Sequence, residues 1–389
     1  MFETLAAQPA DALLALIGLH RDDPRPGKLD LGVGVYRDES GATPIMAAVK
    51  AAERVLLETR TTKSYLGPEG DLTFVDLLKP IVFGGDPGAR LVGLQTPGGS
   101  GALRLGAELI ARARPGARVL VGQPTWPNHA PILDATGLAL VPYPFFDVAT
   151  QTLDFAALTA AIDAAKPGDV VLLHGCCHNP AGADLGDDEW DELAGRLAAR
   201  GVVPFVDLAY QGLGRGLDAD ARGTRRLIER LPEVLVAYSC DKNFGLYRER
   251  VGALYVLVRE EAEVVAVKST LAMLARINWS MPPDHGAAIV RTVLESPELT
   301  AVWREELDRM GTRVRAVRAA LAAAEPRLAY LARQQGMFST LALTRPQIEA
   351  LRVDHAVYMA GSGRINLAGL QVADVPAFVK ALAAVGFPG

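Results

Sequence analysis

Short continuous apolar runs alternate with helical patterns through the middle of the chain. Residues 102–114 and 187–200 have helical spacing and end at Pro115-Gly116 and at Gly201. The apolar runs are typical of strands that are covered on both faces. They lie at residues 118–122, 169–174, 202–207, 234–239 and 252–258. This alternation predicts an α/β fold with a mostly parallel sheet wrapped by helices.

The last third of the chain has a different pattern. A long helical pattern covers residues 299–324, and strands are predicted to follow at 337–343 and 364–367. A chain of 389 residues exceeds what one hydrophobic core usually supports. We therefore expect a large domain at residues 45–305, and a smaller α/β domain formed by residues 1–44 together with 306–389.

Composition excludes several classes of partner. The 45 acidic and 40 basic residues give a formal net charge of -5, which provides no footprint for nucleic acid. The apolar run at residues 12–19 is shorter than the roughly 20 residues that span a bilayer. Three cysteines, two of them adjacent, do not form a disulfide framework. With no basic signal segment at the N-terminus, we expect a cytoplasmic protein without a membrane or nucleic-acid partner.

Polar side chains follow several of the predicted strands. In open α/β sheets, ligands bind outside the carboxyl ends of the strands. The polar and aromatic residues at or just past those ends are Trp126, His174, His178, Asn179, Asp207, Tyr210, Ser239 and Lys242. Their convergence on one edge predicts a binding site there.

A small-residue segment, Gly98-Gly99-Ser100-Gly101, precedes a predicted helix. Small residues let an anion approach the free N–H groups of a helix's first turn. The structural alternative is that Ser100 is an ordinary helix N-cap. Arg250, a fixed positive charge eight residues past Lys242, favours the anion site because it could complete a phosphate clamp.

Lys242 lies between an apolar strand and Asn243-Phe244-Gly245, a poor place for a solvated lysine. A strand-end lysine that reaches water is the alternative. A partly desolvated lysine becomes a nucleophilic amine that can form a Schiff base with an aldehyde. Asp207 could then keep the ring nitrogen of pyridoxal phosphate protonated, although a helix cap or a structural ion pair would also explain it.

A metal site at His174, Cys176, Cys177 and His178 is the main competing interpretation. Ligands so close in sequence would have to fold back sharply, and adjacent cysteines rarely bind one tetrahedral ion. We therefore expect no metal, and a strand end with buried cysteines and hydrogen-bonded histidines instead.

At this combination of residues the chain resembles the class I pyridoxal-phosphate-dependent aminotransferases, and within them the bacterial aspartate and aromatic amino acid aminotransferases. The resemblance runs from Met1 to near the C-terminus. Its motifs are LGVGVYRDE (31–39), KSYLGPEG (63–70), TPGGSGALR (96–104), PTWPNH (124–129), HGCCHNPAG (174–182), VDLAYQGLGRG (206–216), DKNFGLYRERVG (241–252), MPPDHGA (281–287), QQGMFS (334–339) and SGRIN (362–366). It implies the fold-type I transferase fold and a homodimer with shared active sites.

The resemblance also implies roles for single residues. Lys242, Asp207 and Tyr210 would be the catalytic group, with Lys242 holding the cofactor and moving a proton. The implied cofactor-binding residues are Tyr65 (from the neighbouring subunit), Gly99, Ser100, Trp126, Asn179, Asp207, Tyr210, Ser239, Lys242 and Arg250. His129 would support Asp207 from behind.

Substrate binding is implied for Gly34, Trp126, Asn179, Arg276 and Arg364. Arg364 would bind the substrate α-carboxylate in a bidentate pair, and Gly34 lies in the segment that resembles a mobile lid. Arg276, supplied by the other subunit, would pair with the distal carboxylate of a dicarboxylic substrate. The alternative interpretation of Arg276 is a charged residue on a helix surface without a role in binding.

Two positions depart from the family pattern. Asp241 stands before the lysine where the family usually has a phosphate-binding serine, and it would repel a phosphate unless it turns away or pairs with an arginine. Ala181 replaces the common threonine of the Asn-Pro-Thr-Gly turn. Neither departure touches the lysine, the ring aspartate or the substrate arginines.

We expect ping-pong transamination between aspartate or glutamate and 2-oxoglutarate or oxaloacetate, with aromatic amino acids possible as donors. A primarily aromatic aminotransferase that uses 2-oxoglutarate is the first alternative. A β-lyase with the same cofactor ranks below it because the dicarboxylate-type arginine pair is present. A non-catalytic binding module would have lost the lysine or one of the two substrate arginines. Lys242, Arg276 and Arg364 are all present.

Overall fold

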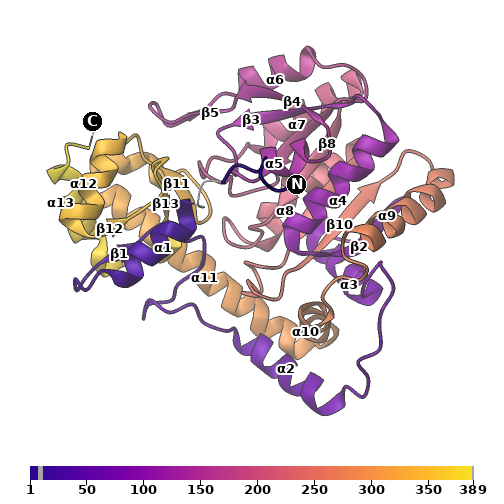
Figure 1. Ribbon diagram of the computed structural model, residues 1–389, viewed down its shortest axis with the longest axis horizontal. Helices are drawn as coiled ribbons and strands as arrows, with labels where there is room; N and C mark the ends of the chain where they lie inside the picture. The colour runs from indigo at the N-terminus through magenta and orange to yellow at the C-terminus, as the bar shows by residue number, and fades with distance from the viewer. Residues whose placement is uncertain (8–11, 388–389) are drawn as a thin grey trace.

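The computed structural model describes residues 1–7 and 12–387, and a seven-stranded sheet forms the centre of this part of the chain (Figure 1). Its order is β2-β10-β9-β8-β7-β3-β4. β10 runs antiparallel to both of its neighbours, and the remaining pairs are parallel. The strands are β2 (Leu91–Pro97), β3 (Arg118–Gln123), β4 (Ala139–Pro144), β7 (Val170–His174), β8 (Val203–Leu208), β9 (Val234–Ser239) and β10 (Val251–Leu257).

Helices cover both faces of this sheet, so successive strand residues are buried on opposite sides. On β8, for example, Phe205 belongs to the hydrophobic cluster under α4 and α9, and Val206 belongs to the cluster under α3, α6, α7 and α8. The helices around the sheet are α2 (Ala47–Thr59), α3 (Leu72–Phe83), α4 (Gly98–Ala113), α5 (His129–Asp134), α6 (Phe155–Asp163), α7 (Asp187–Arg200), α8 (Leu217–Arg230), α9 (Val264–Asn278) and α10 (Asp284–Glu295).

The expected α/β class with a mostly parallel sheet is confirmed, and the five predicted central strands are present within one residue at each end. Two strands were not predicted. β4 is an edge strand with partly exposed residues and two prolines, and β2 is interrupted by Gly93 and Gln95. The helix predicted at 102–114 begins earlier, at Gly98.

A second group of elements lies beside the sheet, at the left of Figure 1. Its buried hydrophobic cluster includes Leu31, Leu328, Ile365 and Phe378. Its elements are α1 (Ala12–Asp22), β1 (Leu29–Asp30), η2 (Pro326–Ala332), β11 (Phe338–Thr340), α12 (Arg345–His355), β12 (Val357–Tyr358), β13 (Arg364–Asn366), η3 (Leu367–Gly369), η4 (Val372–Asp374) and α13 (Val375–Ala384). The short pieces β5 (Phe146–Asp147), β6 (Thr152–Leu153) and η1 (Glu261–Glu263) belong to the sheet side.

The long helix α11 (Pro297–Ala324) connects the two groups. Trp303 and Leu307 pack into a cluster of the large sheet, whereas Val317 and Leu321 pack into the cluster of the second group. The predicted domain boundary after residue 305 therefore falls inside a helix, and the division itself stays a prediction.

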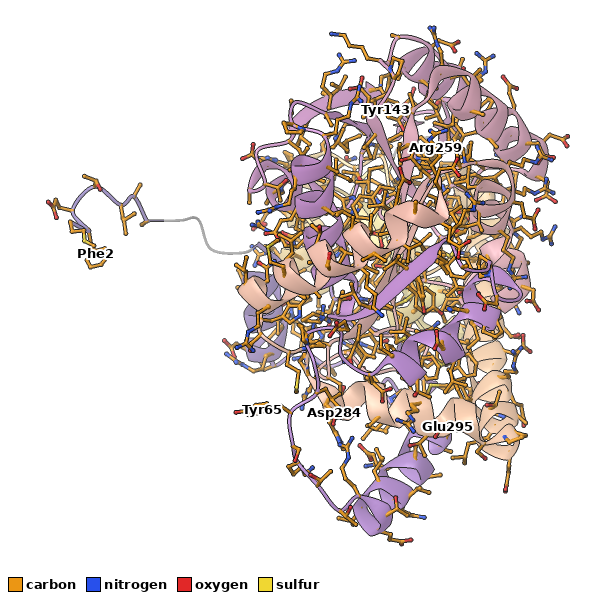
Figure 2. The ribbon with its side chains drawn as sticks, turned by 90° about the vertical axis from the view of Figure 1, so that its right-hand side faces the viewer. Phe2, Tyr65, Tyr143, Arg259, Asp284 and Glu295 are labelled. Atoms are coloured by element: carbon orange, nitrogen blue, oxygen red, sulfur yellow. The ribbon has the colours of Figure 1, made fainter. Side chains whose placement is uncertain are left out.

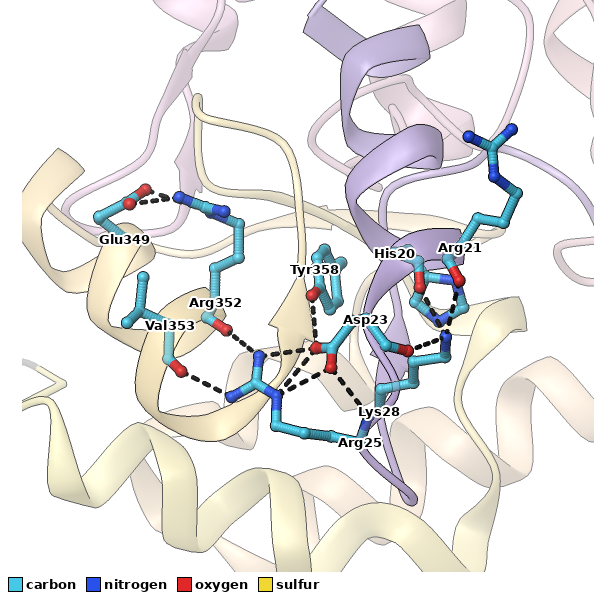
Figure 3. A network of polar contacts seen from close by, with 9 residues as sticks. All are labelled: His20, Arg21, Asp23, Arg25, Lys28, Glu349, Arg352, Val353 and Tyr358. Carbon is cyan, nitrogen blue, oxygen red and sulfur yellow. Dashed lines mark hydrogen bonds and ion pairs between the residues drawn. The ribbon is translucent and has the colours of Figure 1, made fainter.

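Polar contacts tie the N-terminal segment to the second group (Figure 3). β1 pairs in parallel with β12. Asp23 accepts hydrogen bonds from Arg25 Nη2 at 2.7 Å and from Tyr358 Oη at 2.6 Å, and Arg25 Nη1 donates to the Val353 carbonyl at 2.6 Å. Residues more than 300 positions apart in sequence are thus in direct contact.

Among the described residues, no helix combines the length and the apolar character that crossing a membrane requires.

Candidate active site

The carboxyl ends of β3, β7, β8 and β9 lie on the same edge of the sheet because these strands are parallel. Several of the predicted site residues lie at or just past these ends, and some of them contact one another. The Asn179 side chain donates to Tyr210 Oη at 3.3 Å, and the Lys242 amine lies 5.7 Å from the centre of the Tyr210 ring. Side chains from three separate strands therefore meet at one place.

The Lys242 amine has no hydrogen-bond partner among the described residues, and it lies between the rings of Tyr210 and Tyr247, at 5.7 and 5.9 Å from their centres. Burial lowers the pKa of this amine. The negative charge of Asp241 raises that pKa, and the positive charge of Arg250 lowers it further. A larger share of neutral, nucleophilic amine follows from this lowering.

Asp207 stays charged although it is buried. Burial alone would raise the pKa of its carboxyl, but the hydrogen bond from His129 and the nearby positive groups leave that pKa below the ordinary value. His129 Nε2 lies 3.0 Å from Asp207 Oδ2, and its ring packs edge-on against Trp126 with centroids 5.2 Å apart. The site therefore holds a carboxylate whose ionised form is favoured, next to the Trp126–His129 pair.

A hydrogen-bonded chain continues behind His129. Thr125 Oγ1 lies 2.8 Å from His129 Nδ1 and 3.1 Å from His174 Nε2. Burial lowers the pKa of His174 to about 3, so this imidazole is neutral at physiological pH. Thr125 was not among the residues predicted from the sequence; its position directly before Trp126 was the available signal.

Arg364 reaches the site from β13 and lies over the Phe338 ring, 4.7 Å from its centre. Its Nη2 donates to the Gly32 carbonyl at 2.9 Å, its Nη1 reaches Asn179 Oδ1 at 3.5 Å, and its buried Nε has no partner. A half-buried guanidinium whose donors are not all used can bind an anionic ligand.

The N-terminus of α4 lies beside β9 and Arg250. Its N-cap, Pro97, makes no side-chain cap, so the first-turn N–H groups are not satisfied by a capping side chain. Ser100 lies inside the first turn, which rules out the ordinary N-cap alternative. A Cβ at Gly99 would lie 3.1 Å from Ser239 Cβ, and one at Gly98 would lie 2.7 Å from Arg250 Nη2. We call the space that Gly98, Gly99, Ser239 and Arg250 surround the anion cup.

Asp241 pairs with Arg250 at the wall of this cup. Arg250 Nη1 donates to Asp241 Oδ2, and the Val251 N–H donates to Asp241 Oδ1 at 3.2 Å. The carboxylate is only 2% exposed. Of the two outcomes expected for Asp241, the structure therefore has the pairing with an arginine.

Three predicted residues lie apart from this group or at its margin. Tyr65, on the segment between α2 and α3, is 93% exposed and points away from the body of the molecule (Figure 2). Arg276, near the end of α9, is exposed and donates to Ser280 Oγ at 2.9 Å. Gly34 lies against Phe338, where a Cβ would be 3.0 Å from Cζ of that ring.

The adjacent cysteines have a structural explanation. Cys176 and Cys177 lie with Asp220 in a buried group whose ligand atoms are within 4.8 Å of one another. The Asp220 carboxylate already accepts three backbone N–H groups, from Gly212, Gly214 and Arg215. Burial raises the pKa of Cys176 to about 12, against the opposing effect of its bond with Cys177. A buried, protonated thiol is less reactive than a thiolate.

The residues present fit pyridoxal phosphate. The cofactor's aldehyde, ring nitrogen and phosphate need an uncommitted amine, an ionised carboxylate and an anion cup. Lys242, Asp207 and the N-terminus of α4 offer one of each at a single edge, and the glycines at 98 and 99 leave space that a Cβ would fill.

Comparison with known proteins gives the same answer. The family model described as "Aminotransferase class I and II" matches residues 26–382. The chain belongs to this family. The prediction of a pyridoxal-phosphate-dependent transaminase is thereby confirmed, together with its fold class.

Individual relatives cover nearly the whole chain. It is 54% identical to a tyrosine aminotransferase of Rhizobium meliloti, over 96% of this chain and 97% of that protein. It is 42% identical to the aspartate aminotransferase of Escherichia coli, over 99% and 100%. A solved aromatic amino acid aminotransferase of Burkholderia pseudomallei, described as covalently bound to pyridoxal phosphate, superposes with a TM-score of 0.96 at 37% identity, over 99% of each chain.

Proposed function

We propose that this aminotransferase takes its amino group from aromatic and dicarboxylic amino acids and delivers it to 2-oxoglutarate or oxaloacetate, with Lys242, Asp207 and Tyr210 as its catalytic residues. The observation that carries the proposal is the convergence of an unbonded amine and an ionised carboxylate at one sheet edge, with a half-buried arginine that reaches Asn179 from β13.

Bound pyridoxal phosphate supplies an electron-accepting ring that stabilises negative charge at the substrate α-carbon. Asp207 would hold a proton on the ring nitrogen through its carboxylate, because its lowered pKa keeps it charged. His129 orients this carboxylate through the 3.0 Å contact, and Trp126 packs on His129 where it can form one wall of the ring site.

Lys242 would hold the cofactor by its aldehyde carbon and, once displaced by substrate, would move a proton with Nζ. The lowered pKa of the amine suits both tasks, since a neutral amine is the reactive form. Tyr210 Oη and Asn179, joined at 3.3 Å, lie where they can hydrogen-bond a phenolic oxygen of the ring.

Arg364 would bind the substrate α-carboxylate. Its guanidinium is fixed by the Gly32 carbonyl and by the Phe338 ring, so little freedom is lost when a carboxylate binds. Gly34, which lies against the same ring, would belong to the segment that closes over the substrate.

The side-chain preference rests on the relatives and on Arg276. Relatives at 54% and 46% identity are named for tyrosine and aromatic amino acids, and the relative from Escherichia coli named for aspartate is 42% identical. These names favour aromatic donors. Arg276 supports dicarboxylic substrates in addition, because an exposed arginine held by one serine hydroxyl remains free to pair with a carboxylate.

A homodimer with shared sites is part of the proposal. Tyr65 and Arg276 are exposed and do not contact Lys242 in their own subunit, and a second subunit would bring such residues to a site. Leu57 and Ile277 are further exposed apolar side chains, on α2 and α9, which a partner could cover. A cytoplasmic location stays a prediction; the three free, buried cysteines are compatible with it.

Replacing Arg276 with glutamine tests the substrate assignment. With 2-oxoglutarate replaced by an aromatic oxo acid as acceptor, kcat/KM for aspartate should fall about 100-fold or more because one charged pair is lost, while kcat/KM for phenylalanine should change less than about threefold. Arg304→Gln, on the exposed side of α11, serves as the control. Equal losses for both donors would remove the proposed role of Arg276.

A further inference from the structure

Asp241 places a buried negative charge inside the anion cup, next to Arg250, the side chain that gives the cup its full positive charge. The Arg250–Asp241 pair packs against the start of α4, where a Cβ at Gly98 would lie 2.7 Å from Arg250 Nη2 and 3.1 Å from Asp241 Oδ2. Both members of the pair therefore lie beside the start of α4, at the wall of the cup.

The hydrogen bonds around Asp241 leave it able to accept one more donor. Its two oxygens take the Val251 N–H and Arg250 Nη1, and a carboxylate has about four acceptor positions. The Asp241 N–H donates to Ser239 Oγ at 3.2 Å, so the Ser239 hydroxyl hydrogen remains free to donate to a bound anion. The cup thus offers both donors and a strong acceptor.

The charge balance decides which anion fits. Arg250 and Asp241 cancel, and the amides at the start of α4 add only about half a positive charge. A phosphate monoester carries a second proton with a pKa of about 6 in water. A carboxylate beside the group raises that pKa, because two like charges in contact disfavour ionisation. A retained P–O–H would donate its hydrogen to the acceptor that the cup provides.

We propose that Asp241 makes this cup selective for the singly charged form of the cofactor's phosphate group, whose remaining O–H donates to the Asp241 carboxylate. The inference rests on the proposed function, since it assumes that the cup holds the phosphate of pyridoxal phosphate. No covalent bond forms or breaks; above neutral pH, binding takes up one proton from solution. Asp241 thereby acts as a selectivity and positioning residue for the cofactor.

The test measures binding of pyridoxamine 5′-phosphate, which has the same phosphate but no aldehyde to react with Lys242, to the cofactor-free protein between pH 6.5 and 9. The dissociation constant of the unchanged protein should rise about tenfold per pH unit, which is the slope for one proton taken up. The ³¹P resonance of the bound pyridoxamine 5′-phosphate should have the chemical shift of a phosphate monoanion at pH 7.5. Asp241→Asn keeps the shape and should give a flat profile and the shift of a dianion.

Asp241→Ser is the second variant, because it removes the charge and supplies a hydroxyl donor; it should behave as Asp241→Asn does. The matched control is Asp169→Asn, which breaks another buried aspartate–arginine pair at the opposite end of β7, next to Arg118. It should leave both the ³¹P shift and the pH profile unchanged.

A dianion shift in the unchanged protein, or a pH profile that Asp241→Asn does not alter, would overturn the proposal. Either result leaves the function intact if the protein still binds pyridoxal phosphate and transaminates. A protein that binds no pyridoxal phosphate and has no transaminase activity would instead contradict the proposed function.

Discussion

At the scale of single residues, burial and partners give two nearby aspartates opposite properties. Asp207 accepts from His129 and stays ionised, with a pKa below the ordinary value. Asp184 accepts the His178 N–H at 3.1 Å, but its second oxygen is buried without a partner, and burial raises the pKa of this carboxyl to about 6. The ionised Asp207 suits a position that faces a cofactor. The Asp184 carboxylate, when ionised, destabilises the folded protein.

Asp184→Asn should therefore stabilise the protein in a pH-dependent way. The folded pKa of about 6 lies above the unfolded value of about 4, so stability from this carboxyl is present below pH 4 and is lost as the pH rises through 6. At pH 8 the variant should gain up to about 3 kcal/mol, and about half of that at pH 5. Urea unfolding at both pH values measures this; an equal gain at both would contradict it. The exposed Asp188→Asn is the control.

Residue types and their positions at strand ends predicted part of the candidate site from the sequence, and the family resemblance supplied further residues such as Arg276 and Arg364. Lys242, Asp207 and Asn179 are polar groups that follow apolar runs closely, and such positions meet at one edge of a parallel sheet. Thr125 and the free Nε of Arg364 could not be found in this way. Their importance comes from contacts with residues 49 and more positions away, which no local pattern encodes.

At the scale of elements, α4 shows how a helix is placed by what it packs against. Its first residues are glycines and serine, which have low helix propensity, so the sequence predicted a later start. The packing of α4 on β9 and β10 favours the longer helix. Further along, Gly106 lies directly against the Phe205 ring of β8. A small residue there sets how closely the helix approaches the sheet.

Two glycine substitutions separate this packing from helix propensity. Gly106→Ala adds a methyl group where the Phe205 ring lies, and overpacking should destabilise the protein by about 1–3 kcal/mol. Gly195→Ala, in the middle of α7 with nothing within 4 Å of the new Cβ, should instead stabilise it by about 0.5–1 kcal/mol. Thermal unfolding of both variants measures the difference; a stabilised Gly106→Ala protein would contradict the packing account.

At the scale of the whole molecule, the order of elements was predictable but the assembly was not. The alternation of apolar runs and helical patterns predicted the large sheet, and contacts such as Tyr358–Asp23 join segments that are far apart in the sequence. The position of Tyr65 and Arg276 at the surface has no local signature. The proposed homodimer would bring these two residues to the site of the other subunit.

Mixed dimers test whether sites are shared. The Lys242→Ala protein, expected to be inactive, and the Arg276→Gln protein, expected to be strongly impaired toward aspartate, are co-refolded in equal amounts. If Arg276 acts across the interface, each mixed dimer has one complete site, and random pairing should restore about a quarter of the unmutated activity. Refolding Lys242→Ala with itself gives the baseline. Restoration below a few per cent, with mixed dimers present by mass, would place Arg276 in its own subunit's site or in none.

The covalent role of Lys242 is the central claim, and reduction of the cofactor-loaded protein with borohydride tests it most directly. Peptide mass mapping should find the phosphopyridoxyl group on Lys242 alone, because its unbonded, partly desolvated amine is the reactive one. Modification of Lys79 or other lysines, with the peptide that contains Lys242 unchanged, would contradict the account.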